Sequence, residues 1–218
     1  MAAIAFLSRN PSAGLLVVQL LGLPLYALME TSPFGRAFFG AFGVLVLAVA
    51  VRVVRRSPWM TWVGVVLALL IVALSVVGLL VPHPALTAAT AFLEAAFYFY
   101  ATGSLIAYML QDWVATTDEL FAAGATFTLL AWAFAYVYVV CQVIVPGSFG
   151  PADHARTWVE LLFLSVAVLS SVGLSDILPT TPMARSLIML ESFAGIMYIA
   201  LVVSRLISLT AIARRDRT

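Results

Sequence analysis

The stretch that decides the fold is Leu169-Ser170-Ser171-Val172-Gly173-Leu174-Ser175-Asp176, which lies between two apolar runs. The first run, from Trp158 to Leu169, has about 12 residues, and a much longer run starts at Pro182. A bilayer core of about 30 Å needs roughly 20 apolar residues per helix. The first run is therefore too short to span, and it predicts a re-entrant helix that carries the irregular stretch at membrane depth.

The polar backbone of this stretch has a consequence for assembly. Irregular backbone at membrane depth is stable only where protein encloses it or where it lines a watery path. One copy of the loop from Ser170 to Asp176 encloses nothing. We therefore expect several copies of the chain around one axis.

Composition places the whole chain in a membrane. Of its 218 residues, 64% are hydrophobic and 10% are charged, and the mean hydropathy is +1.11. Soluble domains are typically about half apolar and a quarter charged. The net charge is +1 and lysine is absent, so the sequence offers no basis for a nucleic-acid partner. The single Cys141 excludes an intramolecular disulfide and a cysteine metal site, and we expect it to be a small core residue.

The apolar runs predict an all-α integral membrane protein with six transmembrane helices, a re-entrant pore helix and a loop between the fifth and sixth helices. We expect the lipid bilayer and further copies of the chain as its partners. The six spans are Ala13 to Leu28, Gly35 to Val54, Met60 to Val81, Ala85 to Leu110, Leu120 to Val145 and Met183 to Ile207.

Local signals mark the helix starts. Four pairs place a good N-cap residue before a proline, whose missing N–H costs nothing at the first helical position: Asn10-Pro11, Ser32-Pro33, Ser57-Pro58 and Thr181-Pro182. Thr116 with Glu119, and Thr157 with Glu160, have the spacing of a capping box. These pairs predict starts for the fifth span and for the re-entrant helix.

The arginines predict the orientation, because short cytoplasmic loops collect positive charge. With the N-terminus inside, seven arginines are cytoplasmic, namely Arg9, Arg52, Arg55, Arg56, Arg214, Arg215 and Arg217, while Arg36, Arg156 and Arg185 face out. Both termini are then cytoplasmic, and the expected location is the cell (inner) membrane. The same orientation puts the loop after Leu169 on the outer side.

The loop resembles the filter of the potassium-channel superfamily, Thr-Val-Gly-Tyr-Gly-Asp. Val172, Gly173 and Asp176 match, Ser171 stands for Thr, and Leu174 and Ser175 replace Tyr and the second Gly. The flanks are also similar to those of bacterial channels, over Asp176-Ile177-Leu178-Pro179 and Thr181-Pro182-Met183-Ala184-Arg185-Ser186-Leu187. The resemblance covers roughly residues 157 to 210. It implies a homotetramer with one pore loop per six-span chain, and an inner-helix hinge at Gly195.

The resemblance also divides the chain into two parts. Residues 1–112 would form a four-helix bundle in the sensor position, and residues 113–218 would form the pore domain. Glu94 is the only charged group in the fourth span, whereas a voltage sensor needs several arginines there. We therefore expect no steep voltage dependence.

The ion filter implied by the resemblance consists of Ser171, Val172, Gly173, Leu174, Ser175 and Asp176. Backbone carbonyls would replace the ion's hydration shell, with K+ or Na+ as permeant ions and no other cofactor. Ser175 would cost on the order of 1–3 kcal/mol in the family's left-handed conformation, unless the outer half of the filter is rearranged. We expect monovalent cations to pass, with weaker potassium preference than usual.

Residues behind the filter are expected to support it. Phe163 replaces a hydrogen-bonding aromatic partner of the family, so Leu174 is expected to pack with Phe163 and Val166 in an apolar sleeve. Glu191 either lines the cavity or braces the filter through Ser165 or a filter N–H.

Other positions leave alternatives open. Gly195 is either a gating hinge or a small residue that allows close helix packing. Glu94 either makes an interhelical polar contact or belongs to a proton or ion relay. His83 and His154 either sense pH or are exposed loop residues. Asp112, Asp118 and Glu119 pair with Arg52, Arg55 or Arg56, or are solvated.

Other functions compete with a channel. The chain has no Gly-x-Ser-x-Gly, no His-Glu-x-x-His and no intramembrane histidine, so we expect no enzyme. The alternatives are a non-conducting or differently selective relative of potassium channels, a scaffold, or a transporter, although the two related halves of many transporters are absent. No soluble ligand is predicted.

Overall fold

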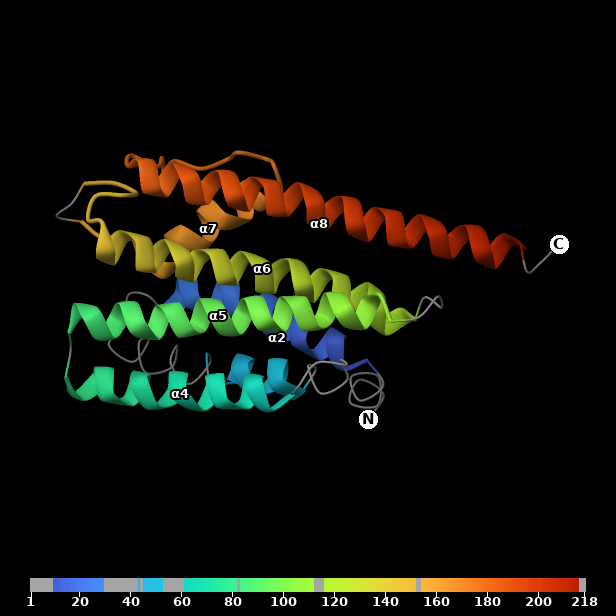
Figure 1. The fold of residues 1–218 in the computed structure, drawn as a ribbon, viewed down its shortest axis with the longest axis horizontal. Coiled ribbons are helices and arrows are strands. Elements are labelled where there is room, and N and C mark those ends of the chain that lie inside the picture. The colour runs from blue at the N-terminus through green and yellow to red at the C-terminus, as the bar shows by residue number, and fades with distance from the viewer. Residues whose placement is uncertain are drawn as a thin grey trace.

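The computed structural model describes residues 10–29, 43, 45–52, 61–81, 83–111, 116–151 and 154–215, and within these ranges it is helical with connecting loops. The labelled helices are α2 (Pro11–Met29), α4 (Thr61–Leu80), α5 (Pro84–Met109), α6 (Thr117–Ile144), α7 (Trp158–Leu169) and α8 (Pro182–Arg215) (Figure 1). Residues 45–52 are also helical, inside the expected second span; the rest of that span lies mostly outside the described residues.

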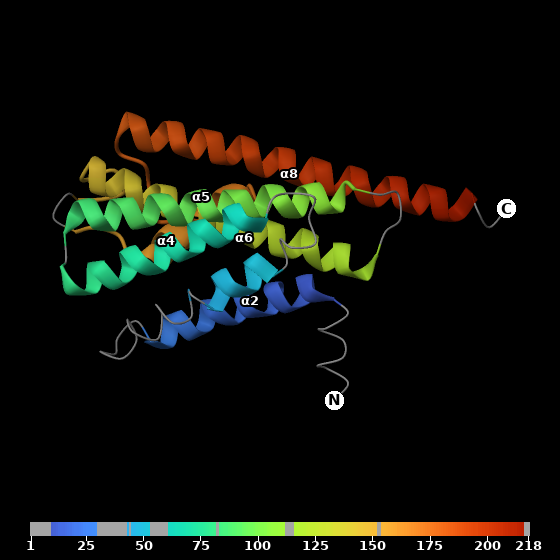
Figure 2. The ribbon, with the colours of Figure 1, turned by 60° about the horizontal axis from the view of Figure 1, so that its bottom comes forward.

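The helices run side by side in a bundle with α6 at its centre. This helix packs against α5 on one side, against α2 on another, and against α7 and α8. Helix α4 packs on α5, and α7 contacts both α6 and α8. Figure 1 shows that α2 begins and α8 ends at the same end of the molecule, and Figure 2 shows α2 on the side opposite α8. The short α7 is therefore held between the two long helices that flank it in sequence.

The helix starts follow the local signals. Helix α2 begins at Pro11 and α8 at Pro182, as their N-cap and proline pairs predict. Thr116 and Thr157 cap α6 and α7. Helix α5 has a cap that the sequence analysis missed, because His83 Nδ1 accepts the N–H of Ala85 at 3.2 Å. The pairs Ser32-Pro33 and Ser57-Pro58 lie outside the described residues.

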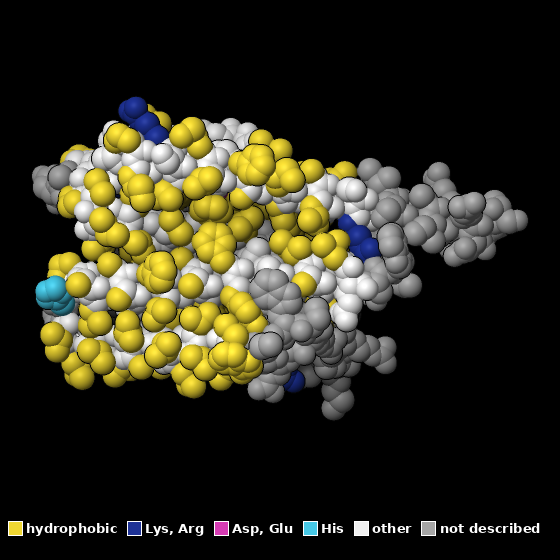
Figure 3. Space-filling view, viewed as in Figure 1, with side chains coloured by type: hydrophobic (Ala, Val, Ile, Leu, Met, Phe, Trp, Pro, Cys, Tyr) yellow, Lys and Arg dark blue, Asp and Glu magenta, His cyan; other side chains and the backbone are white. Residues whose placement is uncertain are grey.

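Three described helices are long and apolar enough to cross a membrane: Trp62–Leu80, Thr117–Ile144 and Pro182–Arg205. The apolar part of α2, Pro11–Pro24, is shorter. Helix α5, expected as a span, has the length but not the hydropathy, because Glu94 and several hydroxyl residues interrupt it. Hydrophobic side chains cover most of the described surface visible in Figure 3.

One hydrophobic core joins the predicted bundle to the predicted pore domain. It contains Leu15 of α2, Ile71 of α4, Phe97 of α5, Leu129 of α6 and Leu169 of α7. A smaller cluster around Tyr138, Cys141 and Leu164 lies between α6, α7 and α8. The buried Cys141 has the core position expected for it.

Candidate functional site

The start of α7 is held by a network of side chains. The Thr157 N–H donates to Glu160 Oε2 at 2.7 Å, and the Glu160 N–H donates to Thr157 Oγ1 at 3.4 Å, which completes the predicted capping box. Arg156 Nη1 lies 2.9 Å from Glu160 Oε1. Burial raises the pKa of Glu160, but the Thr157 N–H and Arg156 outweigh it and hold this pKa below its usual value. Glu160 is thus a capping carboxylate, as expected.

Two reciprocal hydrogen bonds attach this network to the end of α6. The Arg156 N–H donates to Gln142 Oε1 at 3.0 Å, and Gln142 Nε2 donates to the Arg156 carbonyl at 2.8 Å. Arg156 Nε also donates to the Phe149 carbonyl at 3.1 Å. Both the N–H and the carbonyl group of Arg156, the residue before the Thr157 cap, are therefore hydrogen-bonded to Gln142. These bonds fix the position at which α7 starts.

The loop after α7 has an unusual backbone. Ser170 ends the helix with φ −76°, Ser171 has φ 58° and Gly173 has φ 68°. The Ser171 N–H donates to Val168 O at 3.0 Å, and the Gly173 N–H donates to Ala167 O at 3.1 Å. The loop therefore folds back over the last turn of α7, with two left-handed residues two positions apart.

The left-handed positions correct one expectation. Ser171, and not Ser175, is the non-glycine residue with positive φ among the described residues, so Ser175 does not have the strain that the family's left-handed conformation would give it. The Ser175 N–H donates to Gly173 O at 3.1 Å, and Ser175 Oγ accepts the Ile177 N–H at 3.1 Å. These local bonds hold Ser175 in a turn. The alternative of a rearranged outer half agrees with this geometry.

The expected apolar sleeve does not form within one chain. Leu174 is 70% exposed, and Phe163 and Val166 are 48% and 38% exposed. The side chain of Val172 is exposed as well. Because Leu174 is so open, any burial of this side chain has to come from another molecule. The outer face of the loop is therefore left uncovered in a single chain.

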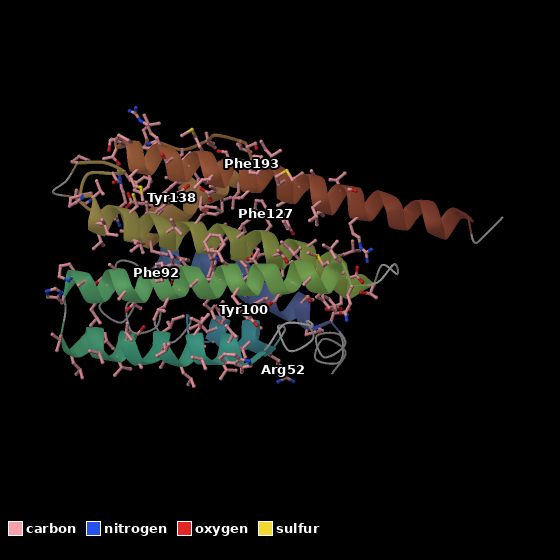
Figure 4. The ribbon with its side chains drawn as sticks, in the orientation of Figure 1. Arg52, Phe92, Tyr100, Phe127, Tyr138 and Phe193 are labelled. Carbon is pink, nitrogen blue, oxygen red and sulfur yellow. The ribbon has the colours of Figure 1, made fainter. Side chains whose placement is uncertain are left out.

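Behind the loop, one carboxyl joins three helices. Glu191 of α8 is fully buried and accepts hydrogen bonds from Ser165 Oγ of α7 and from the hydroxyl of Tyr138 in α6. Ser165 Oγ also lies 2.9 Å from the Ala131 carbonyl. The expected contact with Ser165 is confirmed. Tyr138, which lies between α6 and α8 in Figure 4, was missed; its signal is a hydroxyl inside an apolar run.

Gly195 packs directly against the end of α7. A Cβ at this position would lie 2.5 Å from the Leu169 carbonyl oxygen and 2.9 Å from the Leu169 Cα. One turn away, the Tyr198 hydroxyl donates to the Ala123 carbonyl of α6. The geometry fits the close-packing alternative for Gly195, and the hinge stays a prediction.

A second polar cluster lies where α6 begins. Asp118 accepts the N–H and the hydroxyl of Ser12, each at 3.0 Å, and the hydroxyl of Tyr108 at 3.1 Å. Glu119 Oε2 lies 3.5 Å from Arg205 Nη2. These described partners tie α2, α5, α6 and α8 together. Asp112, Arg55 and Arg56, the other residues of the expected coupling, lie outside the described residues.

The remaining singled-out residues have ordinary contacts. Glu94 of α5 forms a side-chain hydrogen bond with Tyr136 of α6, which is the interhelical contact expected for it. His83 and His154 are exposed. Within the described residues, no group of three His, Cys, Asp or Glu side chains could hold a metal ion.

Comparison with known proteins relates part of the chain to a family. Residues 124–211 match the family described as ion channel, Ion_trans_2, and this stretch runs from α6 through α7 and the loop into α8. No curated protein and no solved structure matches the chain. The apolar helices indicate a membrane protein, and the match supports an ion channel. The region from α6 to α8 is thus similar to the domains of ion channels.

Proposed function

We propose that the protein is a tetrameric channel for monovalent cations, with residues Ser171 to Asp176 as its filter. The observation that carries the proposal is the backbone after α7, where left-handed Ser171 and Gly173 follow a helix too short to span. This loop lies inside the stretch that is similar to ion channels. The channel would sit in the cell membrane with both termini cytoplasmic.

The backbone supports conduction through carbonyl groups. Left-handed residues that alternate with others allow successive carbonyls to face one side, and rings of such carbonyls can replace the hydration shell of an ion. The C-terminal end of α7 also carries partial negative charge from its aligned peptide dipoles. Ser170, which ends α7, places that charge next to the loop. Both features favour a cation.

The exposed surface supports assembly around the loop. Val172 is 68% exposed in one chain, although the backbone beside it would lie at membrane depth. One apolar face of α8 is open too, with Met189, Phe193, Ile196 and Met197 all more than half exposed. Four copies around a cyclic axis would enclose the loop and cover this face.

The outer half of the loop supports relaxed selectivity. Ser175 is held in a turn by its bonds to Gly173 O and to the Ile177 N–H. A filter that selects strictly for K+ needs its carbonyl rings in register along the whole path. With fewer matched rings, we expect K+ and Na+ to permeate at similar rates.

The test is ion flux through the purified protein in liposomes, with potassium, sodium and chloride gradients applied in turn. Gly173→Asp is expected to abolish flux, because it places an aspartate on a left-handed filter residue. Phe92→Ala, at an exposed position of α5 far from the loop in sequence, is the matched control and should keep wild-type flux. Chromatography with light scattering checks that each variant is tetrameric.

The outcomes separate the candidate functions. Potassium and sodium flux of similar size would support the relaxed cation channel, and a strict potassium preference would contradict the selectivity argument. Chloride flux would overturn the cation filter. A tetramer without flux would indicate the non-conducting relative, and a stable monomer would overturn the assembly.

A further inference from the structure

A pocket of about 360 Å³ lies apart from the loop, between α4, α5 and α6 at the start of α7. This volume is within the range of small-molecule sites in proteins. Its apolar wall includes Leu74 and Leu79 of α4, Leu86 of α5 and Val139 of α6. Nothing in the proposed filter uses this pocket.

One carboxyl supplies the chemical character of the pocket. Glu94 is the acid among the lining residues, and these residues include no arginine or lysine. His83 also lines the pocket, and its Nδ1 accepts the Ala85 N–H at the start of α5. Glu94 hydrogen-bonds to Tyr136, and a carboxyl with two oxygens can accept further donors.

Two of the hydroxyl groups of the lining residues donate to the backbone of α5. Thr90 Oγ1 donates to the Leu86 carbonyl at 2.9 Å, and Thr87 Oγ1 donates to the His83 carbonyl at 3.4 Å. Neither hydroxyl proton remains for a ligand. Glu94 is the acidic group of the pocket, and its carboxyl oxygens suit a ligand with N–H donors and a positive charge.

Aromatic rings form the wall beside Glu94. Tyr136 and Trp158 line the pocket, with ring centroids 5.4 Å apart. Trp158 also meets Trp132 edge to face at 5.2 Å, and Tyr136 stacks on Tyr98 at 5.7 Å. Aromatic faces attract ammonium groups, best for Trp and then Tyr, and they also accept apolar bodies. Since Trp158 is the first residue of α7, a ligand here would touch the re-entrant helix.

We infer that this pocket binds a small amphipathic amine, whose ammonium group meets the Glu94 carboxyl and whose apolar body lies against the aliphatic wall and Trp158. The inference does not depend on ion conduction, because it concerns a separate cavity. A site with one acid and no arginine or lysine among its lining residues should discriminate strongly between a cation and a neutral molecule of the same shape.

The experiment measures binding to the full-length protein in lipid nanodiscs by equilibrium dialysis. The probe is 4-phenylbutylamine, and the neutral comparison is 4-phenylbutan-1-ol. Glu94→Gln keeps the size of the side chain and an oxygen for the contact with Tyr136, but it removes the carboxyl group that can form an ion pair with an amine. Gly78→Leu adds volume at a lining position where a Cβ has room, 3.7 Å from Leu86 Cδ2. Phe92→Ala, at an exposed position of the same helix as Glu94, is the control.

The amine should bind saturably to the wild type and the Phe92→Ala variant, about tenfold or more weakly to Glu94→Gln, and negligibly to Gly78→Leu. The alcohol should bind the wild type and Glu94→Gln equally weakly. Equal amine affinity for the wild type and Glu94→Gln would overturn the inference, as would binding no greater than partition into empty nanodiscs. If Glu94→Gln does not fold, unchanged amine binding by Gly78→Leu would still overturn it. These binding measurements do not require ion flux, so the inference can be tested even if the protein does not conduct ions.

Discussion

Gly195 and Leu169 are in backbone contact: a Cβ on Gly195 would lie 2.5 Å from the Leu169 carbonyl oxygen and 2.9 Å from its Cα. Leu169 is the last residue of α7, and the loop with left-handed Ser171 follows it directly. The neighbouring atoms are backbone, so they cannot move aside as the end of a side chain can. This contact therefore sets the position of the loop relative to α8.

Gly195→Ala is expected to destabilise the protein by on the order of 1–3 kcal/mol, since the added methyl group must push two helix backbones apart. Gly78→Ala is the matched control, because its Cβ would meet Leu86 Cδ2 at an ordinary 3.7 Å. Thermal unfolding in the same detergent compares the two. If both variants melt like the wild type, the contact between α7 and α8 is looser than the structure indicates.

Ser171→Gly is expected to stabilise the chain by about 1 kcal/mol, because glycine adopts φ 58° without the strain that a side chain adds. Ser170→Gly should have the opposite sign, since Ser170 is right-handed at φ −76° and donates its hydroxyl to Val166 O at 2.7 Å. The free energies of unfolding of the two variants are the measurement. The same sign for both would contradict the left-handed assignment of Ser171.

Glu191→Ala is expected to cost about 1–3 kcal/mol, because it leaves the buried Tyr138 hydroxyl without its acceptor. The Ser165 hydroxyl also loses Glu191 but keeps the Ala131 carbonyl at 2.9 Å. Tyr138→Phe removes one bond and should cost about 1 kcal/mol. In a double-mutant cycle, the effect of Tyr138→Phe should nearly vanish in the Glu191→Ala background. Strict additivity would show that the two side chains do not interact.

Arg205→Leu is expected to destabilise the protein by about 3–5 kcal/mol, since it leaves the nearly buried Glu119 without its cationic partner. Arg52→Leu serves as the control, because Arg52 is exposed in the described structure. Combining Arg205→Leu with Glu119→Leu should recover much of the loss. A double variant as unstable as the single one would argue against the ion pair as the cause.

The cap of α7 predicts a pH dependence. The pKa of Glu160 is lowered in the folded chain from its ordinary 4.5, so its contribution to stability is complete above that value. The contribution is lost as pH falls through the folded pKa. Between pH 7 and acid conditions, the melting temperature of the wild type should therefore fall more than that of Glu160→Gln. If the melting temperatures of the wild type and Glu160→Gln fell by the same amount, groups other than Glu160 would cause the acid sensitivity.

Much of the local structure was predictable because its causes are local. Thr157 and Glu160 are three residues apart, and the capping box between them depends only on that spacing and on the first turn of the helix. Proline after a capping residue likewise places the start of α8 at Pro182. The length of the apolar run up to Leu169 correctly indicated a helix too short to span.

The candidate site was only partly predictable. Ser165 was expected beside Glu191 because both are polar residues in apolar helices, but Tyr138 lies 53 residues from Glu191 and has no spacing that links the two. In the family's filter conformation Ser175 would be the left-handed serine, whereas the structure has a left-handed serine at Ser171. The conformation of Ser175 depends on its hydrogen bonds to neighbouring backbone groups. A comparison of motifs does not take such bonds into account.

The sequence by itself determined the membrane class, the helix starts and the short helix with its irregular loop, because hydropathy, capping and length act within about 20 residues. Only the tertiary structure decided which helices meet behind that loop. The contact of Gly195 with Leu169 and the shared carboxyl of Glu191 arise when α6, α7 and α8 pack. Such contacts depend on the relative position of whole helices, which no local pattern encodes.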